Sequence, residues 1–343
     1  MKVKLEEVCE RDSSNLKQSD IIGMEGNYPI YGASGYIGNV NFYHQKNSYV
    51  AVVKDGAGIG RTTLHPAKSS VIGTMQYLVP KDNVIPEYLY YVVSHMHLEK
   101  YFTGATIPHI YFKDYKNEEF NLDSVDEQKQ IVNILGKCET IIKSRKRELK
   151  LLDDLIKARF VEMFGDPVSN SYGLPEATLP ELGEFGRGIS KHRPRNDPKL
   201  LGGGYPLIQT GDVANAGLYI TSYNSTYSEL GLRQSKMWKK GTLCITIAAN
   251  IAKTAILTFD ACFPDSVVGF TANEKTNNIF IHYWFLFFQT ILESQAPESA
   301  QKNINLKILS ELRVIVPKKE KQDEFVDFIH QVDKSKVVVA SVK

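Results

Sequence analysis

The sequence is poor in cysteine, and its cysteines form no recognisable pattern. The four residues, Cys9, Cys138, Cys244 and Cys262, lie far apart and include no CxxC pair. This spacing argues against both a zinc site and a disulfide framework. We therefore expect reduced thiols, as in an intracellular protein.

Long hydrophobic runs are also missing. The opening residues, MKVKLEEVCERDSS, contain no apolar segment of the signal-peptide type. The most apolar stretch, residues 279–292, includes His282 and Gln289 and is too short to span a bilayer. The sequence thus predicts a soluble, cytoplasmic protein that has no membrane partner.

Familiar catalytic and metal-binding patterns are lacking as well. No GxSxG or HExxH motif occurs, and the glycine series Gly56, Gly58 and Gly60 has neither GxGxxG spacing nor the Lys-Ser/Thr ending of a phosphate-binding loop. A hairpin is the better interpretation of these glycines. His95 and His97 lie two residues apart on an expected helix and so face different directions. No catalytic residue and no metal ligand is predicted.

An excess of one charge is absent, because 41 Lys and Arg residues nearly balance 39 Asp and Glu residues, for a net charge of +2. Any contact with a polyanion must therefore come from a local patch. The 43% hydrophobic content and 23% charged content are ordinary for a folded protein, and 343 residues suffice for about two domains.

A tandem duplication is the strongest positive feature of the sequence. Residues 104–114 (GATIPHIYFKD) and 126–135 (DEQKQIVNIL) recur as residues 298–308 (ESAQKNINLKI) and 320–329 (EKQDEFVDFI). Equivalent positions, such as His109 and Asn303, are 194 residues apart (303 minus 109). Solenoid repeats are much shorter, at roughly 20–50 residues, so the period indicates two whole domains.

The pattern between the repeats alternates between mixed domains and helices. Short glycine-broken β-type runs precede an expected helix over residues 86–102, and a second mixed region follows from about residue 174 to 317. Residues 126–164 contain one glycine and no proline, and their apolar residues follow a near-heptad spacing, which predicts one helix about 60 Å long. A closing helix is expected over residues 318–336.

These observations predict an α+β protein with two tandem mixed α/β domains. The expected division is a first domain over residues 1–123, a long spacer helix over 124–165, a second domain over 166–317 and a C-terminal spacer helix over 318–343. Apolar complementarity favours antiparallel packing of the two helices, and the duplication favours pseudo-two-fold symmetry.

The order and doubling of these motifs resemble the specificity subunit of type I restriction-modification systems. The likeness is carried by YPIYGASGYIG, VKDGAGIG, VDEQKQIVNIL, LKLLDDLIKARFVEMFGDP and SAQKNINLKIL before VIVPKKEKQDEF, which together extend over almost the whole chain. In that family each mixed domain is a target recognition domain that reads one half of a split DNA sequence, and the helices set the spacing and dock two methylation subunits.

The resemblance implies a non-catalytic DNA-recognition and scaffolding subunit. Its partners would be double-stranded DNA, two methylation subunits and restriction subunits. S-adenosylmethionine (AdoMet), ATP and Mg²⁺ would act on those partner subunits, with no cofactor in this chain. A specificity protein of a methylation-only complex remains an alternative. A protein-protein scaffold that does not bind DNA, and an independent enzyme, are rivals from other classes.

A basic run in the second domain is the first candidate for contact with DNA. Residues 187–199 carry five formal cations against one acid, and we select Lys191, Arg193 and Arg195. Cations pair with phosphates, and planar hydrogen-bonding side chains read base edges. A solvated surface loop is the alternative interpretation.

The duplication supplies further candidates at equivalent positions. Gln301, Lys302 and Asn303 offer amide and ammonium groups for bases or phosphate, and His109 occupies the matching loop of the first domain. These loops could instead be structural turns. Two matched cations after small-residue turns are expected to bind phosphate; they are Arg61 and Lys253.

Overall fold

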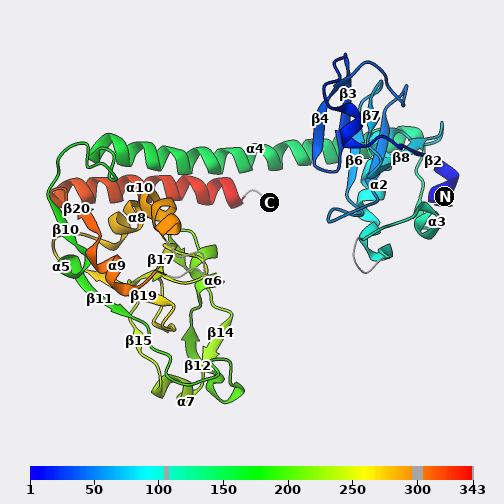
Figure 1. The fold of residues 1–343 in the computed structure, drawn as a ribbon. Helices are drawn as coiled ribbons and strands as arrows, with labels where there is room; N and C mark the ends of the chain where they lie inside the picture. Colours follow the sequence, from blue (N-terminus) through cyan, green and yellow to red (C-terminus); the bar gives the residue numbers. More distant parts are fainter. Residues whose placement is uncertain (104–107, 296–303, 342–343) are drawn as a thin grey trace. The chain divides into compact units, whose positions relative to one another are not determined.

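The computed structural model describes residues 1–103, 108–295 and 304–341, which divide into a first compact unit, Met1–Ser144, and a second, Arg145–Lys343. The long helix is confirmed as a single element, α4 (Val125–Phe164), which starts in the first unit and ends in the second (Figure 1). Among the described residues, no helix is both long and apolar enough to cross a membrane.

The first unit combines three small sheets with short helices. Before α4, its elements in chain order are β1 (Lys2–Lys4), α1 (Leu5–Val8), β2 (Cys9–Ser13), η1 (Gln18–Ile21), β3 (Tyr28–Gly32), β4 (Gly35–Val40), β5 (Tyr49–Val53), β6 (Thr62–His65), β7 (Ser70–Val71), β8 (Met75–Pro80), α2 (Pro86–His95), η2 (Leu98–Tyr101), α3 (Phe112–Tyr115) and β9 (Glu119–Asn121). The strand orders are β2-β8-β5-β6, β4-β3-β7 and β1-β9. Strand β5 is buried on both faces and forms the centre of the core.

The second unit follows the same plan with longer connections. Its elements are β10 (Glu176–Thr178), α5 (Leu179–Leu182), β11 (Gly183–Arg187), η3 (Pro198–Leu200), β12 (Leu201–Leu207), α6 (Thr210–Asn215), β13 (Tyr219–Ile220), β14 (Ser225–Tyr227), α7 (Glu229–Arg233), β15 (Met237–Trp238), β16 (Leu243–Thr246), β17 (Thr254–Leu257), β18 (Ala261–Cys262), β19 (Val267–Ala272), α8 (Asn278–Gln295), α9 (Leu306–Glu311), β20 (Arg313–Ile315) and α10 (Lys319–Ser341).

Strand pairing shows that the two units share one topology. The order β2-β8-β5-β6 of the first unit recurs as β11-β19-β16-β17, to which β13 adds an edge strand. The parallel pair β3–β7 recurs as β12–β18, and the two-stranded ladder β1–β9 recurs as β10–β20. The duplication predicted from the sequence is therefore confirmed at the level of the fold.

A buried glutamine marks the same position in each unit. Gln128 accepts a hydrogen bond from the Ile85 backbone N–H and donates to the carbonyls of Asn83 and Asp123, all at 2.9 Å. Both Gln128 and its equivalent in α10, Gln322, are fully buried. Each ties the first turn of its helix to the preceding mixed region.

Gln322 repeats this arrangement in the second unit. It donates to the carbonyls of Lys275 at 3.0 Å and Pro317 at 2.9 Å, and it accepts from the Thr276 hydroxyl at 2.9 Å. The two glutamines stand at the repeat spacing of 194 residues (322 minus 128), and both positions use an amide that donates and accepts.

The C-terminal half of α4 packs antiparallel on α10 within the second unit. Phe160 and Phe164 contact Phe325 near the start of α10, with ring centroids 5.4 and 5.7 Å apart. Lys336, later in α10, forms a 2.7 Å ion pair with Asp153, which lies earlier in α4. Since the numbers rise along one helix as they fall along the other, the predicted antiparallel packing is confirmed.

The expected helix over residues 86–102 was too long. Helix α2 ends at His95, and a separate 3₁₀ turn, η2, begins at Leu98. Between them His97 adopts a left-handed conformation with φ of 52°, which an α-helix cannot accommodate. The closing helix runs from Lys319 to Ser341, past residue 336 where its pattern was expected to end and within the 318–343 segment assigned to it.

Each unit buries one histidine that should stay neutral. Burial lowers the pKa of both His65 and His282 from 6.5 to about 4. The His65 ring stacks on Tyr49 at 5.3 Å, and the Nδ1 atom of His282 lies 2.9 Å from the Thr254 hydroxyl. Protonation of either ring in the folded state would place an unpaired charge in the core.

We expect acid to destabilise both units before most carboxylates titrate. The unfolded chain binds these protons below pH 6.5 and the folded chain only near pH 4, so stability is lost as the pH falls through that window. Each histidine should lower the free energy of unfolding by about 2 kcal/mol between pH 7 and pH 5. Urea unfolding at both pH values measures this, and His282→Gln should flatten the pH dependence. An unchanged pH dependence in that variant would contradict the assignment.

Candidate nucleic-acid interface

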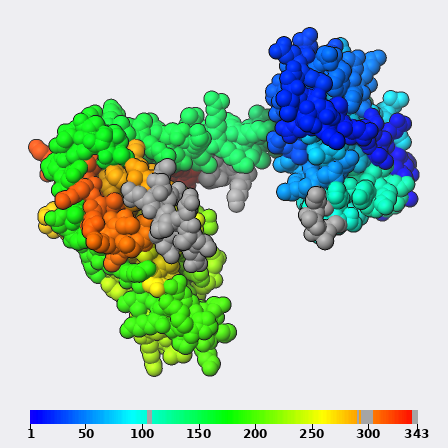
Figure 2. Space-filling model, viewed as in Figure 1, coloured from blue at the N-terminus to red at the C-terminus, as the bar shows by residue number. Residues whose placement is uncertain are grey.

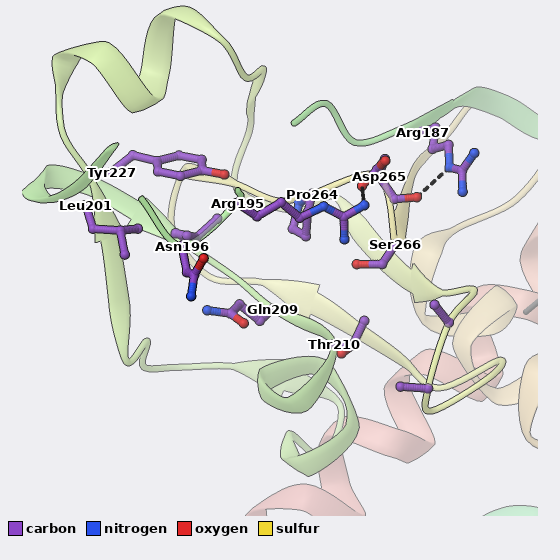
Figure 3. A pocket seen from close by; sticks show the side chains of 13 residues that line it. Arg187, Arg195, Asn196, Leu201, Gln209, Thr210, Tyr227, Pro264, Asp265 and Ser266 are labelled. Atoms are coloured by element: carbon purple, nitrogen blue, oxygen red, sulfur yellow. Dashed lines mark hydrogen bonds and ion pairs between the residues drawn. The ribbon is translucent and has the colours of Figure 1, made fainter. Parts of the chain in front are cut away.

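Four connections of the second unit enclose a polar pocket of about 390 Å³ (Figure 3). They are the β11–η3 loop, the junction of β12 and α6, the β16–β17 hairpin and the β18–β19 turn. Within the unit, α10 lies at one end and the small sheet with β12 and β14 extends toward the other (Figure 1). Leu201 and Leu207 of β12 and Tyr227 of β14 also line it, so the pocket is made by loops and by the strands beside them.

Asp265 gathers three arginines beside this pocket. Arg193 lies 3.3 Å from its Oδ2 atom, and Arg195 forms a second ion pair with Oδ1. The Nε atom of Arg187 donates to the Asp265 backbone carbonyl. Arg187, Arg195 and Asp265 line the pocket itself. The sequence count of one acid against the basic run thus missed a carboxylate that lies some seventy residues later in the chain.

Neutral hydrogen-bonding groups also line the pocket. Asn196, Gln209, Thr210 and Ser266 come from three of the four connections, and all four are labelled in Figure 3. The Gln209 amide nitrogen lies 3.4 Å from the Ser225 hydroxyl, and its backbone N–H donates to Asp212 at 2.8 Å. The pocket therefore offers both charged and neutral donors.

Lys191 belongs to the same loop but does not line the pocket. Its backbone N–H donates to the Gln234 side chain at 2.7 Å, while the side chain is exposed. Among the residues that the structure describes, no ion pair is formed by Lys191. Nearby, the Lys199 backbone N–H, and then His192, lower the pKa of Asp197, so this acid stays ionised beside His192.

Lys253 is less accessible than expected for a phosphate ligand. It is the last residue of the β16–β17 connection, is partly buried, and its ammonium lies 3.2 Å from the Gln289 side chain on α8. Its predicted partner in the repeat, Arg61, is exposed and donates to the Ala33 carbonyl in the β3–β4 turn. The two cations thus occupy matched loops but contact different neighbours.

The first unit brings His109 to the corresponding hairpin. Its Nδ1 atom lies 2.5 Å from Asp55, and its ring stacks on Tyr111 at 6.3 Å. The Gly56 N–H donates to the Pro108 carbonyl at 3.0 Å, which joins the β5–β6 hairpin to this segment. Gly60 has φ of 80°, and a side chain there would collide with the Glu99 backbone. The hairpin predicted for these glycines is confirmed, since β5 and β6 pair antiparallel.

The remaining candidates fall elsewhere. Gln301, Lys302 and Asn303 lie outside the described residues. Of the other six, the structure brings Arg193 and Arg195 together on Asp265, and it places Arg61 and His109 in adjoining loops of the first unit. Contact with DNA stays a prediction for all nine residues.

Sequence reasoning missed Asn196, Gln209 and Asp265. Asn196 directly follows the selected arginines and could have been included for its amide. Gln209 and Asp265 carry no local signal, because only the pairing of β12 with β18 brings their loops together. Within the described ranges, no cluster of three or more His, Cys, Asp or Glu side chains is arranged to hold a metal ion.

Comparison with known proteins gives this geometry a context. The family model described as "Type I restriction modification DNA specificity domain" matches residues 1–152 and again residues 176–338. These two matches coincide with the two copies of the fold and together include most of the chain.

Individual relatives agree with the family model. A Methanocaldococcus jannaschii protein, provisionally named the type I restriction enzyme MjaX specificity subunit, is 21% identical over 319 residues, which is 87% of this chain and 72% of that protein. The MjaIX specificity subunit of the same organism is 28% identical over 93 residues, or 26% of this chain and 22% of that protein.

A solved structure shows the same fold. The type I restriction-modification system S subunit from M. genitalium superposes with a TM-score of 0.63 at 15% identity, over 99% of this chain and 91% of its own. At this identity the likeness concerns the fold alone, while the family model matches both halves of the sequence. The chain belongs to the type I restriction modification DNA specificity family.

Proposed function

We propose that this chain reads a bipartite DNA target, one half-site with each unit, as the recognition and scaffolding subunit of a type I restriction-modification complex. The observation that supports this most directly is the repetition of one topology, including a loop cluster with basic side chains, in a single chain. Two similar DNA-binding units suit two separate stretches of one duplex. A DNA ligand would also place the protein in the cytoplasm.

Catalysis in this proposal belongs to other chains. Two methylation subunits and the restriction subunits would supply the AdoMet, ATP and Mg²⁺ chemistry, and this chain would hold no cofactor. Exposed isoleucines on α4 support a docking role: Ile134, Ile141 and Ile142 are 59%, 52% and 53% exposed. A helix that leaves such side chains in water suits a partner that covers them.

Exchange of one unit provides the experiment. Residues 176–317 would be replaced by the corresponding unit of a relative with a different target, and the chimaera would be purified with its methylation subunits. Because each unit has its own core and its own loops, we expect only one half of the recognised sequence to change. Methylome sequencing of cells that carry each version measures this result.

The control is the reverse chimaera, in which residues 1–123 are exchanged, and it should change the other half. If either exchange altered both halves, the division into two independent readers would be wrong. Retention of a restriction subunit during purification then separates a restriction complex from a methylation-only complex.

A further inference from the structure

We propose that the pocket of the second unit binds the major-groove edge of a guanine in one half-site, with Arg195 as the base-reading side chain and Asp265 as the residue that positions it. The inference rests on the proposed function and adds a ligand class and a specificity residue to it. It concerns the pocket of about 390 Å³ that Figure 3 shows.

Arg195 can contact a ligand in the pocket while it stays paired with Asp265. Its side chain is 46% exposed and lines the pocket, while the ion pair with Asp265 Oδ1 engages one of its terminal nitrogens. A guanidinium has five N–H donors in a fixed plane, so donors remain for a second partner. Guanine presents two acceptors, N7 and O6, that match two such donors.

The acid in the pocket wall favours a base over a phosphate. A phosphate oxygen bound to Arg195 would lie close to the Asp265 carboxylate and be repelled by it, whereas the guanine edge is uncharged. Arg193 also pairs with the Asp265 carboxylate, and Arg187 donates to the Asp265 backbone carbonyl, so both the side chain and the backbone of this residue are held. Lys191, unlike Arg195, forms no ion pair with an acid within the described part of the chain. Its ammonium is therefore better suited to a phosphate.

Two amide side chains add further hydrogen-bonding groups to the pocket. Asn196 and Gln209 bring amides, the side chains that pair with adenine, next to the arginine. The Asn196 side chain forms no hydrogen bond among the described residues, and the Gln209 amide nitrogen makes one long contact, at 3.4 Å from the Ser225 hydroxyl. A pocket with one guanidinium and two available amides suits a short run of base pairs that includes a guanine.

Selection from a random duplex library tests the proposal. The full chain, bound to its methylation subunits, would be used as wild type and as Arg195→Ala, Arg195→Lys and Asp265→Asn. We expect both Arg195 variants to lose about tenfold or more in preference for guanine at one position of one half-site, while the other half-site is kept. Asp265→Asn should weaken the same preference without reducing affinity for random duplex, since it removes a negative charge.

Asp260→Asn is the matched control, because Asp260 forms a 2.8 Å ion pair with Lys239 and does not line the pocket. An Arg195→Lys variant that behaves as wild type, or an Arg195→Ala variant that binds every duplex more weakly with an unchanged motif, would show a phosphate contact and overturn the inference. An equal effect of Asp260→Asn would also overturn it. Failure of the wild-type complex to select any motif would instead count against the proposed function.

Discussion

Replacing Phe160 with alanine should destabilise the second unit by about 3–5 kcal/mol. Phe160 is fully buried on α4, and its ring contacts Phe280, Phe287 and Phe325 at centroid distances of 5.4, 5.1 and 5.4 Å. Those partners come from α8 and α10, so one side chain joins three helices. Its removal leaves a cavity and also ends several aromatic contacts.

Chemical denaturation followed by circular dichroism and tryptophan fluorescence measures this loss. Both tryptophans, Trp238 and Trp284, belong to the second unit, so fluorescence reports on that unit. Val161→Ala is the control, because Val161 is the next residue of α4 and is 38% exposed. Equal destabilisation by the two substitutions would contradict a central role for Phe160 in the packing of α4 on α10.

The buried glutamines should give the second largest effect. Gln128→Ala removes three hydrogen bonds and leaves the Ile85 N–H and two carbonyls without that partner. Gln322→Ala also removes three hydrogen bonds, to two carbonyls and from one hydroxyl. A buried polar group that loses its hydrogen-bond partner destabilises the fold more than the loss of an exposed hydrogen bond does. The free energy of unfolding of each variant should therefore fall by about 2–4 kcal/mol. Urea unfolding measures the loss.

Exposed glutamines on the same helices provide matched controls. Gln130 lies two residues from Gln128 on α4, and Gln331 lies on α10, and both are exposed. Their replacement by alanine should change the free energy of unfolding by less than about 0.5 kcal/mol. If Gln128→Ala were as mild as Gln130→Ala, the hydrogen bonds at the start of α4 would contribute little to stability.

The sequence could reveal the large features because they rest on long-range regularity. The repeat at a spacing of 194 residues predicted one fold used twice, and shared strand orders confirm it. The absence of proline and the near-heptad pattern predicted α4 as a single helix. Such patterns need only periodicity and composition, which a single sequence displays directly.

The candidate site was less accessible to prediction because its parts are distant in sequence. The basic run was recognised, but Asp265, which pairs with Arg193 and Arg195, follows them by some seventy residues. Its position depends on the turn between β18 and β19, and no local pattern encodes that approach. The break at His97 was missed for a related reason, since histidine does not signal a left-handed backbone as glycine does.

The ladders β1–β9 and β10–β20 have a consequence for how such chains can be recombined. Each ladder pairs the first strand of its unit with a strand just before the following helix, and in the first unit the Met1 amino group also donates to the Leu122 carbonyl at 2.9 Å. The entry and exit of each module are thus neighbours, so a gene segment cut at these seams would transplant most of a hydrophobic interior. In the second module the contacts of α8 with Phe160 of α4 and Phe325 of α10 cross the seam. Crossovers there offer a route to new target combinations wherever the apolar residues of α4 and α10 that face the module are kept.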